Sequence, residues 1–417
     1  MARTSTQTGL DLLARARPKW LRGRRVGLLM HPASIDARLE SARTIVARLC
    51  GDRLRALYGP QHGFAGEKQD NMIESGHGRD PALDIPVHSL YSETRAPTAA
   101  MLADIDLLLV DLQDVGTRVY TFEWTTALAL EACAAAGKEI VVLDRPNPIG
   151  GQILEGNLIR PGYTSFVGLY PVPMRHALTL GELAALVNAR LAAAGGSGPA
   201  APVRPQPRQD GPGVRCTGLA DLTIVPMRGW RRRMAFDDTG LPWVLPSPNI
   251  PTLDTAVVYP GAVLFEGTDL SEGRGTSRPF ELIGAPWIDG ERFADAMNAR
   301  QIPGAWFRAA FFEPTFHKQA RLLCGGCQVH VTDRKALPSM RVAVEMLDEF
   351  RREAPSEKLW RDPPYEYEHV KPPIDILYGS DRLRKGIDSG ESPASIMKDW
   401  KRDEDAFRKL RQPFLLY

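Results

Sequence analysis

Residues Leu107–Arg118 read LLLVDLQDVGTR, an uninterrupted apolar run that ends abruptly in polar side chains. Such a run is typical of a strand that is buried on both faces of a parallel sheet. Asp111, Gln113, Asp114 and Arg118 follow it directly. In open α/β sheets, ligands bind outside the carboxyl ends of the strands. We therefore expect this junction to belong to a functional site.

Three further apolar runs in the first 150 residues also end in polar or glycine-rich segments, and helix-like stretches lie between the runs. This alternation predicts βαβ units and a Rossmann-like, doubly wound, mostly parallel sheet of the α/β class. The polar strand ends should then share one cleft, although Asp and Asn also cap helices and close turns. The runs are Val26–Met30 before His31, Leu54–Gly59 before Gln61 and His62, and Glu139–Leu143 before Asp144 and Arg145; the helix-like stretches are Glu40–Cys50, Pro97–Ala103 and Thr125–Ala136.

Length and charge limit the classes of function. A chain of 417 residues is long enough for two or three domains. Its 52 Lys and Arg residues are balanced by 50 Asp and Glu residues, so no nucleic-acid partner is expected. No run of about 18 apolar residues occurs, which predicts no membrane span. The first 20 residues lack the apolar centre of a secretory signal, and we expect a cytoplasmic protein.

A segment rich in Gly, Pro and Ser divides the chain at residues 193–213. It predicts a Rossmann-like catalytic domain over residues 1–195, a linker or exposed loop over 196–213, and an α+β auxiliary domain over 214–417 that completes the cleft. Just before it, Thr179–Glu182 has the pattern of a capping box that opens a helix ending at Ala194. His176 lies upstream of that helix, where it could bind a ligand or be a half-buried histidine bonded to backbone.

The second half contains two candidate site loops. Leu241–Pro251 holds four prolines and must be an ordered loop without regular structure. Thr268–Thr276 carries glycines that let the backbone approach a ligand, with Glu266 and Arg274 nearby as polar groups. Neither a P-loop nor a GxGxxG motif is present, so no nucleotide cofactor is expected. Two amphipathic helices are predicted, with an irregular segment between them: Arg341–Glu353, Ser392–Arg411 and, between these, Pro363–Tyr378.

Five cysteines, an odd number spread over the chain, do not form a disulfide framework. Cys324 and Cys327 form one CxxC motif, flanked by His317 and His330. No second ligand pair with zinc-site spacing follows it. We expect buried thiols at the start of a strand, and neither a metal nor another cofactor.

Several motifs, in order, resemble those of one enzyme family. The chain is similar to the exo-β-N-acetylmuramidases, glycoside hydrolase family 171, which was long described as a domain of unknown function. The resemblance runs from near Leu10 to Tyr417. The matching segments are Gly59–Phe64 (GPQHGF), Pro86–Tyr91 (PVHSLY), Gln113–Arg118 (QDVGTR), Leu143–Gly151 (LDRPNPIGG), Arg175-His176, Glu266–Arg278 (EGTDLSEGRGTSR) and Gly284–Pro286.

The resemblance implies a cofactor-free glycosidase that releases terminal N-acetylmuramic acid from the non-reducing ends of peptidoglycan fragments during cell-wall recycling. It also implies an active site between a Rossmann-like domain and an auxiliary domain. The lactyl carboxylate of this sugar would pair with an arginine. The candidates for that arginine are Arg118, Arg145, Arg175 and Arg274; the other substrate-binding candidates are Gln61, His62, Gln113, Asp144, Asn147, His176 and Glu266.

One departure from the family pattern concerns the catalytic acid. Family members often have Glu-His-Gly-Phe where this chain has Gln61, and a glutamine cannot donate an acidic proton. Glycoside hydrolysis normally uses two carboxyl groups. We expect Glu67 or Glu74 to replace the acid, with Asp111 or Asp114 as its partner or as the group that orients the acetamido substituent. The alternatives are a catalytically reduced muropeptide-binding protein and a metal-dependent hydrolase that uses Asp111, Asp114, His62 and His176.

Overall fold

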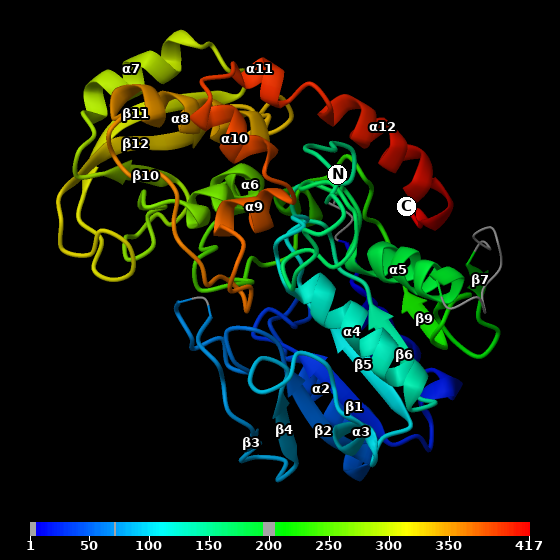
Figure 1. Cartoon of the computed structure of the whole chain (residues 1–417). Coiled ribbons are helices and arrows are strands. Elements are labelled where there is room, and N and C mark those ends of the chain that lie inside the picture. Colours follow the sequence, from blue (N-terminus) through cyan, green and yellow to red (C-terminus); the bar gives the residue numbers. More distant parts are fainter. Residues whose placement is uncertain (1–5, 71, 195–204) are drawn as a thin grey trace.

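The computed structural model describes residues 6–70, 72–194 and 205–417. Within them the first part of the chain forms a nine-stranded sheet with the order β3-β4-β2-β1-β5-β6-β9-β8-β7 (Figure 1). Strands β4, β2, β1, β5, β6 and β9 are parallel; at the two edges, β3 pairs antiparallel with β4, β8 with β9, and β7 with β8. The mostly parallel sheet is therefore confirmed. The strands are β1 (Val26–Met30), β2 (Leu54–Gly59), β3 (Gly78–Arg79), β4 (Pro86–Ser89), β5 (Leu107–Asp111), β6 (Glu139–Leu143), β7 (Gln206–Pro207), β8 (Val214–Cys216) and β9 (Leu222–Val225).

Helices cover both faces of this sheet because successive side chains of a strand point to opposite faces. In β5, Leu107 and Leu109 pack with Ile45 of α2 in one apolar core. Leu108 and Val110 pack with Trp124 of α4 in a second core. The sheet is thus doubly wound, as the alternating pattern predicted. The helices of this part are α1 (Gly9–Ala16), α2 (Ala42–Cys50), α3 (Ala99–Leu102), α4 (Phe122–Ala135) and α5 (Leu180–Ala194).

The predicted domain boundary does not coincide with a boundary between sheets. Residues 214–225, expected in the auxiliary domain, form β8 and β9 of the first sheet. The reason is that α5 acts as a crossover helix, so β9 pairs in parallel with β6. The expected capping box at Thr179 and Glu182 is present at the start of α5. The predicted linker falls partly on residues 195–204, which lie outside the described residues.

The second part combines helices with an antiparallel sheet that has three strands in the described residues, in the order β10-β12-β11. Phe293 of α7 stacks on Phe350 of α8, with ring centroids 4.1 Å apart. The expected α+β auxiliary domain is confirmed. Its elements are α6 (Leu253–Ala262), β10 (Leu282–Ala285), α7 (Gly290–Ala299), β11 (Ala305–Phe312), β12 (Cys324–Val331), α8 (Ser339–Glu353), α9 (Pro373–Tyr378), α10 (Arg382–Asp388), α11 (Pro393–Ile396) and α12 (Trp400–Arg411). Short 3₁₀ helices are η1 (Lys19–Leu21), η2 (Gly51–Arg53), η3 (Phe236–Thr239), η4 (Val263–Gly267) and η5 (Gln412–Phe414).

Two predicted elements differ in detail. The single helix expected over Ser392–Arg411 is divided into α11 and α12. The segment expected to be irregular, Pro363–Tyr378, ends in the helix α9. Local signals explain α9, since Pro373 occupies its first turn and Gly379 ends it with a φ of 82°. The Cys324 motif does begin a strand, as predicted, and both thiols are buried.

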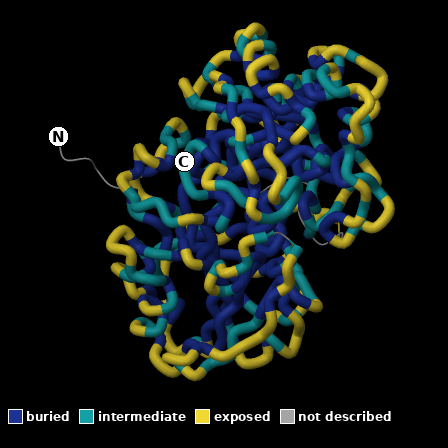
Figure 2. The backbone as a smooth tube through the Cα atoms, turned by 90° about the vertical axis from the view of Figure 1, so that its left-hand side faces the viewer, coloured by how far each residue is buried: buried dark blue, intermediate teal, exposed yellow. Residues whose placement is uncertain are grey.

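The two parts share one apolar core and are also joined by the end of the chain. Buried backbone continues from one lobe into the other, while exposed segments lie at the periphery (Figure 2). After α12, the last residues of the chain return to the first turn of α5. The Tyr417 hydroxyl donates to Asp144 Oδ2 at 2.7 Å, and the Leu416 N–H donates to Glu182 at 2.8 Å. The final residues therefore fix the auxiliary domain to the carboxyl edge of the sheet.

Candidate active site

A pocket lies where the carboxyl edge of the sheet meets the auxiliary domain. Four of the predicted site residues line it: Gln61, His62, Glu266 and Arg274. The part of the chain just before α9, residues 363–372, reaches the loop that follows β2 (Figure 1). The pocket is therefore built from segments that are far apart in the sequence. Its other lining residues are Val119, Tyr120, Thr121, Phe122, Val167, Ser247, Ile250, Tyr259, Phe280, Tyr365 and Glu366.

Glu366 is a buried carboxyl group in this pocket, with only 4% of its surface exposed. Its Oε1 accepts from Gln61 Nε2 at 3.1 Å and its Oε2 accepts from the Tyr91 hydroxyl at 2.8 Å. Burial raises the pKa of Glu366 to about 7, and the nearby Glu266 adds to the rise, while Tyr91 and Gln61 oppose it. At neutral pH a large fraction of this carboxyl group therefore keeps its proton.

The backbone at Glu366 is held in an unusual conformation. Glu366 and Tyr367 have φ angles of 44° and 66°, in the left-handed region that side chains rarely adopt. Such conformations persist where the surroundings hold them, and they cluster at functional sites. Here a backbone pairing between Tyr365 and Glu368 closes the turn. The strained turn directs Glu366 toward Gln61 on the opposite domain.

Glu266 is the second carboxyl group of the described pocket lining. Its Oε1 accepts from Arg274 at 2.8 Å and its Oε2 accepts from the Tyr365 hydroxyl at 2.6 Å. Arg274 also donates to Glu272 at 2.8 Å. Burial alone would lower the pKa of Arg274, but the two glutamates raise it above its usual value. Glu266 is thus fixed in one orientation by a permanent cation and a phenol.

His62 is held as a neutral ring at the pocket wall. Its Nδ1 lies 2.9 Å from the carbonyl oxygen of Lys68, which can only accept, so Nδ1 carries the hydrogen. Nε2 then accepts from the Ser247 hydroxyl at 3.2 Å. Burial lowers the pKa of His62 to about 4. His62 therefore ties the loop after β2 to the proline-rich loop and carries no charge at neutral pH.

The strand ends of β5 and β6 are occupied by a closed ion pair. Arg145 donates to both carboxylate oxygens of Asp111, at 2.6 and 2.8 Å, and both side chains are buried. Arg145 also donates to the Ile35 carbonyl. Burial raises the pKa of Asp111, and Arg145 opposes the rise. Neither side chain lines the pocket, so this pair joins three loops at the sheet edge.

Arg118 and Arg175 are likewise bonded to the protein itself. The two terminal nitrogens of Arg118 donate to the carbonyls of Asn157, Val172, Leu377 and Tyr378. Arg175 donates to Glu155 at 2.8 Å and to the Ile149 carbonyl at 2.7 Å. Neither guanidinium lines the pocket. Their contacts join loops of the first domain to each other and, through Arg118, to α9.

Three more predicted binding residues hold loops together. Gln113 donates to the Pro146 carbonyl at 2.9 Å, and Asn147 donates to the Leu178 carbonyl at 2.9 Å. Asp144 accepts from the Gly181 N–H, the Thr179 hydroxyl and the terminal Tyr417. The carboxyl ends of the strands do gather at one edge, as expected, but most polar groups there bond to one another instead of lining the pocket.

Asp114 and His176 belong to a buried cluster with Glu123, whose candidate ligand atoms all lie within 4.8 Å of one another. His176 Nδ1 accepts from the Leu178 N–H, so the hydrogen of the neutral ring is on Nε2, 3.1 Å from Glu123 Oε2. A protonated Nε2 has no lone pair for a metal ion. Burial raises the pKa of Asp114 to about 7 and that of Glu123 well above its usual value. The tautomer set by Leu178 therefore directs an N–H of His176, and not a lone pair, toward Glu123.

The two glutamates expected to supply the acid lie outside the pocket lining. Glu67 is exposed on the loop after β2. Glu74 is exposed as well, and it accepts from the Tyr367 hydroxyl at 3.0 Å and from Arg95 at 3.5 Å. Glu74 thus lies at the rim, next to the residue that follows Glu366.

Sequence reasoning missed Glu366, Tyr365 and the aromatic residues Tyr120 and Tyr259. Tyr365 and Glu366 lie in the segment that was expected to be irregular. The sequence did offer one local signal for these residues. From Tyr365 the segment reads YEYEH, in which aromatic and acidic residues alternate outside any helical pattern. That pattern does not indicate which side chains the acidic residues contact in the folded protein.

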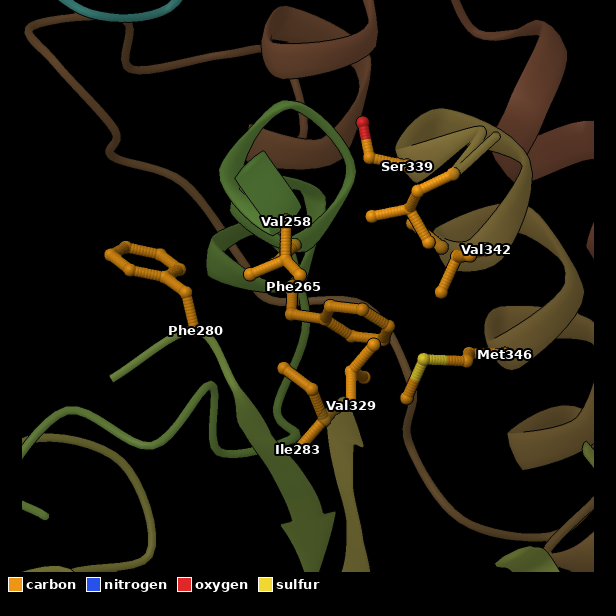
Figure 3. A pocket seen from close by; sticks show the side chains of 11 residues that line it. Val258, Phe265, Phe280, Ile283, Val329, Ser339, Val342 and Met346 are labelled. Atoms are coloured by element: carbon orange, nitrogen blue, oxygen red, sulfur yellow. The ribbon is translucent and has the colours of Figure 1, made fainter. Parts of the chain in front are cut away.

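A second, small cavity lies inside the auxiliary domain between α6, α8, β10 and β12 (Figure 3). Its labelled side chains are apolar apart from Ser339, whose hydroxyl donates to Glu155. It contains none of the carboxyl groups described above. We interpret it as a packing gap in the core.

The fold and the pocket define a class: a two-domain α/β protein with a pair of buried carboxyl groups between its domains. Comparisons with known proteins agree. Profiles for the N- and C-terminal parts of the exo-β-N-acetylmuramidase NamZ match residues 26–254 and 257–417. The chain is 40% identical over 411 residues to the peptidoglycan β-N-acetylmuramidase NamZ of Bacillus subtilis strain 168, covering 99% of this chain and 91% of that protein. The chain belongs to the NamZ exo-β-N-acetylmuramidase family.

Solved structures show the same fold. One DUF1343-family protein of Bacteroides fragilis superposes with a TM-score of 0.84 at 32% identity, covering all of both chains. A second from the same organism gives a TM-score of 0.73 at 26% identity, covering 99% of each chain. The two family profiles meet between residues 254 and 257, where α6 begins. In the described part of this chain, no helix has the length and apolarity needed to cross a membrane.

Proposed function

We propose that this protein is an exo-acting β-N-acetylmuramidase that releases terminal N-acetylmuramic acid from the non-reducing ends of peptidoglycan fragments. The observation that carries the proposal is the pair Glu266 and Glu366 in one buried pocket, in a chain similar to an enzyme named for that activity. Glycosidases typically hydrolyse the glycosidic bond with two carboxyl groups on either side of it. One carboxyl group acts as the proton donor and the other as the carboxylate partner, and these roles require different environments. Glu366 has neutral hydrogen-bond donors, whereas Glu266 is paired with Arg274.

Glu366 is the proposed general acid. Its pKa of about 7 keeps it substantially protonated near neutral pH, which suits a group that donates a proton to the leaving oxygen. Its hydrogen bonds come from Gln61 and Tyr91, which are neutral donors. These two hydrogen bonds orient the carboxyl group. Unlike a bond from an arginine or lysine, they bring no positive charge that would hold the group deprotonated. Gln61 thus acts as a positioning residue for the acid.

Glu266 is the proposed carboxylate partner. Arg274 and Tyr365 donate to its two oxygens from two sides and fix its orientation in the pocket. A fixed negative charge stabilises the oxocarbenium-like transition state, either directly or by acting on the substrate's acetamido group or a water molecule. Tyr120 and Tyr259, with ring centroids 6.4 Å apart, add aromatic walls on which the apolar face of a sugar ring can pack.

We place this activity in cell-wall recycling inside the cytoplasm. All five cysteines are free thiols, and unpaired cysteines are typical of a reducing compartment. The nearly balanced charge of the chain favours a small-molecule partner over nucleic acid.

The proposal is tested by turnover of a nitrophenyl β-N-acetylmuramide and of a natural disaccharide by the purified protein. We expect Glu266→Gln to lower kcat by about 10²-fold or more, since the variant loses a charge that stabilises the transition state. Glu357→Gln, on an exposed glutamate of the auxiliary domain, is the matched control and should act like wild type. Binding of muramic acid without turnover in wild type would contradict the proposal and favour a muropeptide-binding protein.

A further inference from the structure

Arg95 lies beside the proposed acid but outside the pocket lining. Its guanidinium carbon is 3.4 Å from the centre of the Tyr367 ring and 5.0 Å from that of Tyr91. Tyr91 is the residue whose hydroxyl donates to Glu366, and Tyr367 follows Glu366 in the chain. The arginine is therefore held by aromatic faces at the rim of the site.

The two terminal nitrogens of this guanidinium differ in their contacts, one short and one long. One terminal nitrogen donates to the Ser92 carbonyl at 2.6 Å, and the other is 3.5 Å from the exposed Glu74. Nε of Arg95 has no hydrogen-bond partner among the described residues. A long contact with an exposed carboxylate contributes little to stability. A ligand carboxylate can take the place of Glu74, because stacking on rings leaves the in-plane N–H groups of an arginine available.

The arginines expected to bind the lactyl carboxylate are engaged elsewhere. Arg145 is paired with Asp111, and Arg175 with Glu155. Arg274 is bonded to Glu266 and Glu272. The terminal nitrogens of Arg118 each have two carbonyl acceptors. Among these five arginines, Arg95 is the one with a replaceable partner.

We propose that Arg95 is the specificity residue that binds the free carboxylate of the lactyl substituent, and this inference rests on the proposed function. Tyr91 contacts both the proposed acid and the proposed anion site. Its hydroxyl donates to Glu366, and its ring packs against Arg95. One side chain thereby sets the spacing between the proton donor and the anion site. An amide-linked peptide removes the lactyl charge, so the protein should prefer sugars whose lactyl group is a free acid.

The experiment compares two substrates that share one nitrophenyl leaving group: the β-N-acetylmuramide with a free lactyl carboxylate, and its neutral lactyl methylamide. For wild type we expect kcat/KM to be about tenfold or more higher on the free acid, the effect of losing one hydrogen-bonded charge. Arg95→Gln should remove this preference by lowering the rate on the acid alone, and Arg95→Lys should restore part of it. Any effect of Arg95 on Glu366 itself changes both rates equally and leaves the ratio unchanged.

Arg351→Gln is the matched control, because Arg351 is a partly exposed arginine of α8 with backbone acceptors and an exposed acidic partner, Asp388. It should keep the wild-type ratio. An Arg95→Gln variant that also keeps the wild-type ratio, or a wild type without preference, overturns the inference and leaves the proposed function intact. A wild type that hydrolyses neither substrate refutes the proposed function instead. In that event calorimetric binding of N-acetylmuramic acid and of its lactyl amide to wild type and Arg95→Gln tests the anion site.

Discussion

Two groups of acidic side chains lie near the carboxyl edge of the sheet, and they differ in what they face. Asp111 is bonded on both oxygens by Arg145 and is closed off from the pocket. Glu366 is bonded by the neutral donors Gln61 and Tyr91 and lines the pocket. An acid that is fully paired with a cation holds the fold together. An acid with neutral partners beside a cavity keeps its proton available for chemistry.

Substituting Glu366 tests the catalytic side of this comparison and should have the largest effect. Glu366→Gln keeps the size of the side chain, so we expect folding to be preserved while turnover of a natural disaccharide falls by about 10²–10⁴-fold. A substrate whose leaving group needs no proton should recover much of that loss. Thermal unfolding of the variant serves as the control for folding. Equal losses on both substrates would exclude Glu366 as the proton donor.

Substituting Asp111 tests the structural side. Asp111→Asn leaves Arg145 buried without a counter-charge, and breaking a buried pair in this way costs about 3–5 kcal/mol. Denaturant unfolding should show this loss, while the protein that remains folded keeps its kcat. Asp111→Asn combined with Arg145→Met should recover part of the stability. A large loss of kcat with unchanged stability would instead assign Asp111 to the chemistry.

Asp114, in the buried cluster with Glu123 and His176, provides a pH-dependent test of the structural side. Its folded pKa of about 7 lies above the value of about 3.9 for an unfolded Asp. The folded state therefore retains a proton that the unfolded state releases, and wild type loses stability as the pH rises from about 4 to 7. Asp114→Asn has no such proton, so its stability relative to wild type should increase over that range, by on the order of 2–4 kcal/mol. A pH-independent difference would contradict the raised pKa.

Gln61→Glu tests the role of the residue that departs from the family pattern. The substitution places a carboxyl group where an amide now donates to Glu366 at 3.1 Å. Losing that donor and adding a like charge both raise the pKa of Glu366. The alkaline limb of the kcat/KM profile should therefore move up by about one pH unit or more. A sharp rise in maximal rate without this shift would indicate that position 61 is the better place for the acid.

Glu67→Gln should have the smallest effect. The side chain is exposed and does not line the pocket, so we expect less than about a twofold change in turnover, far below the loss expected for a general acid. Turnover of the natural disaccharide is the measurement. A loss as large as that of Glu366→Gln would restore the sequence-based hypothesis that Glu67 is the acid.

The strands and helices of the first domain were predictable because their signals are local. Apolar runs such as Leu107–Asp111, alternating with helical stretches, predicted the doubly wound sheet and its common carboxyl edge. The same reasoning led to Gln61 and His62, because they directly follow β2. Glu266 and Arg274 were found through their glycine-rich loop and the family resemblance. These residues are recognisable within a window of a few neighbours.

Other parts of the site were not predictable in this way. Gln61 and Glu366 are 305 residues apart, and no pattern near either residue indicates the other. Arg118, in the QDVGTR motif of the family resemblance, was expected to be a candidate partner of the lactyl carboxylate. In the structure its guanidinium donates to the carbonyls of Leu377 and Tyr378, from α9 of the other domain, and to two further carbonyls.

The sequence by itself determined the fold class, the family and the sheet edge near which the site is built, because hydrophobic periodicity and short motifs act over a few residues. Only the tertiary structure decided which acids face the pocket and which are sealed in pairs. Whether a carboxyl group keeps its proton depends on burial and on the charge of its partners. For Glu366 those partners, Gln61 and Tyr91, come from the other domain.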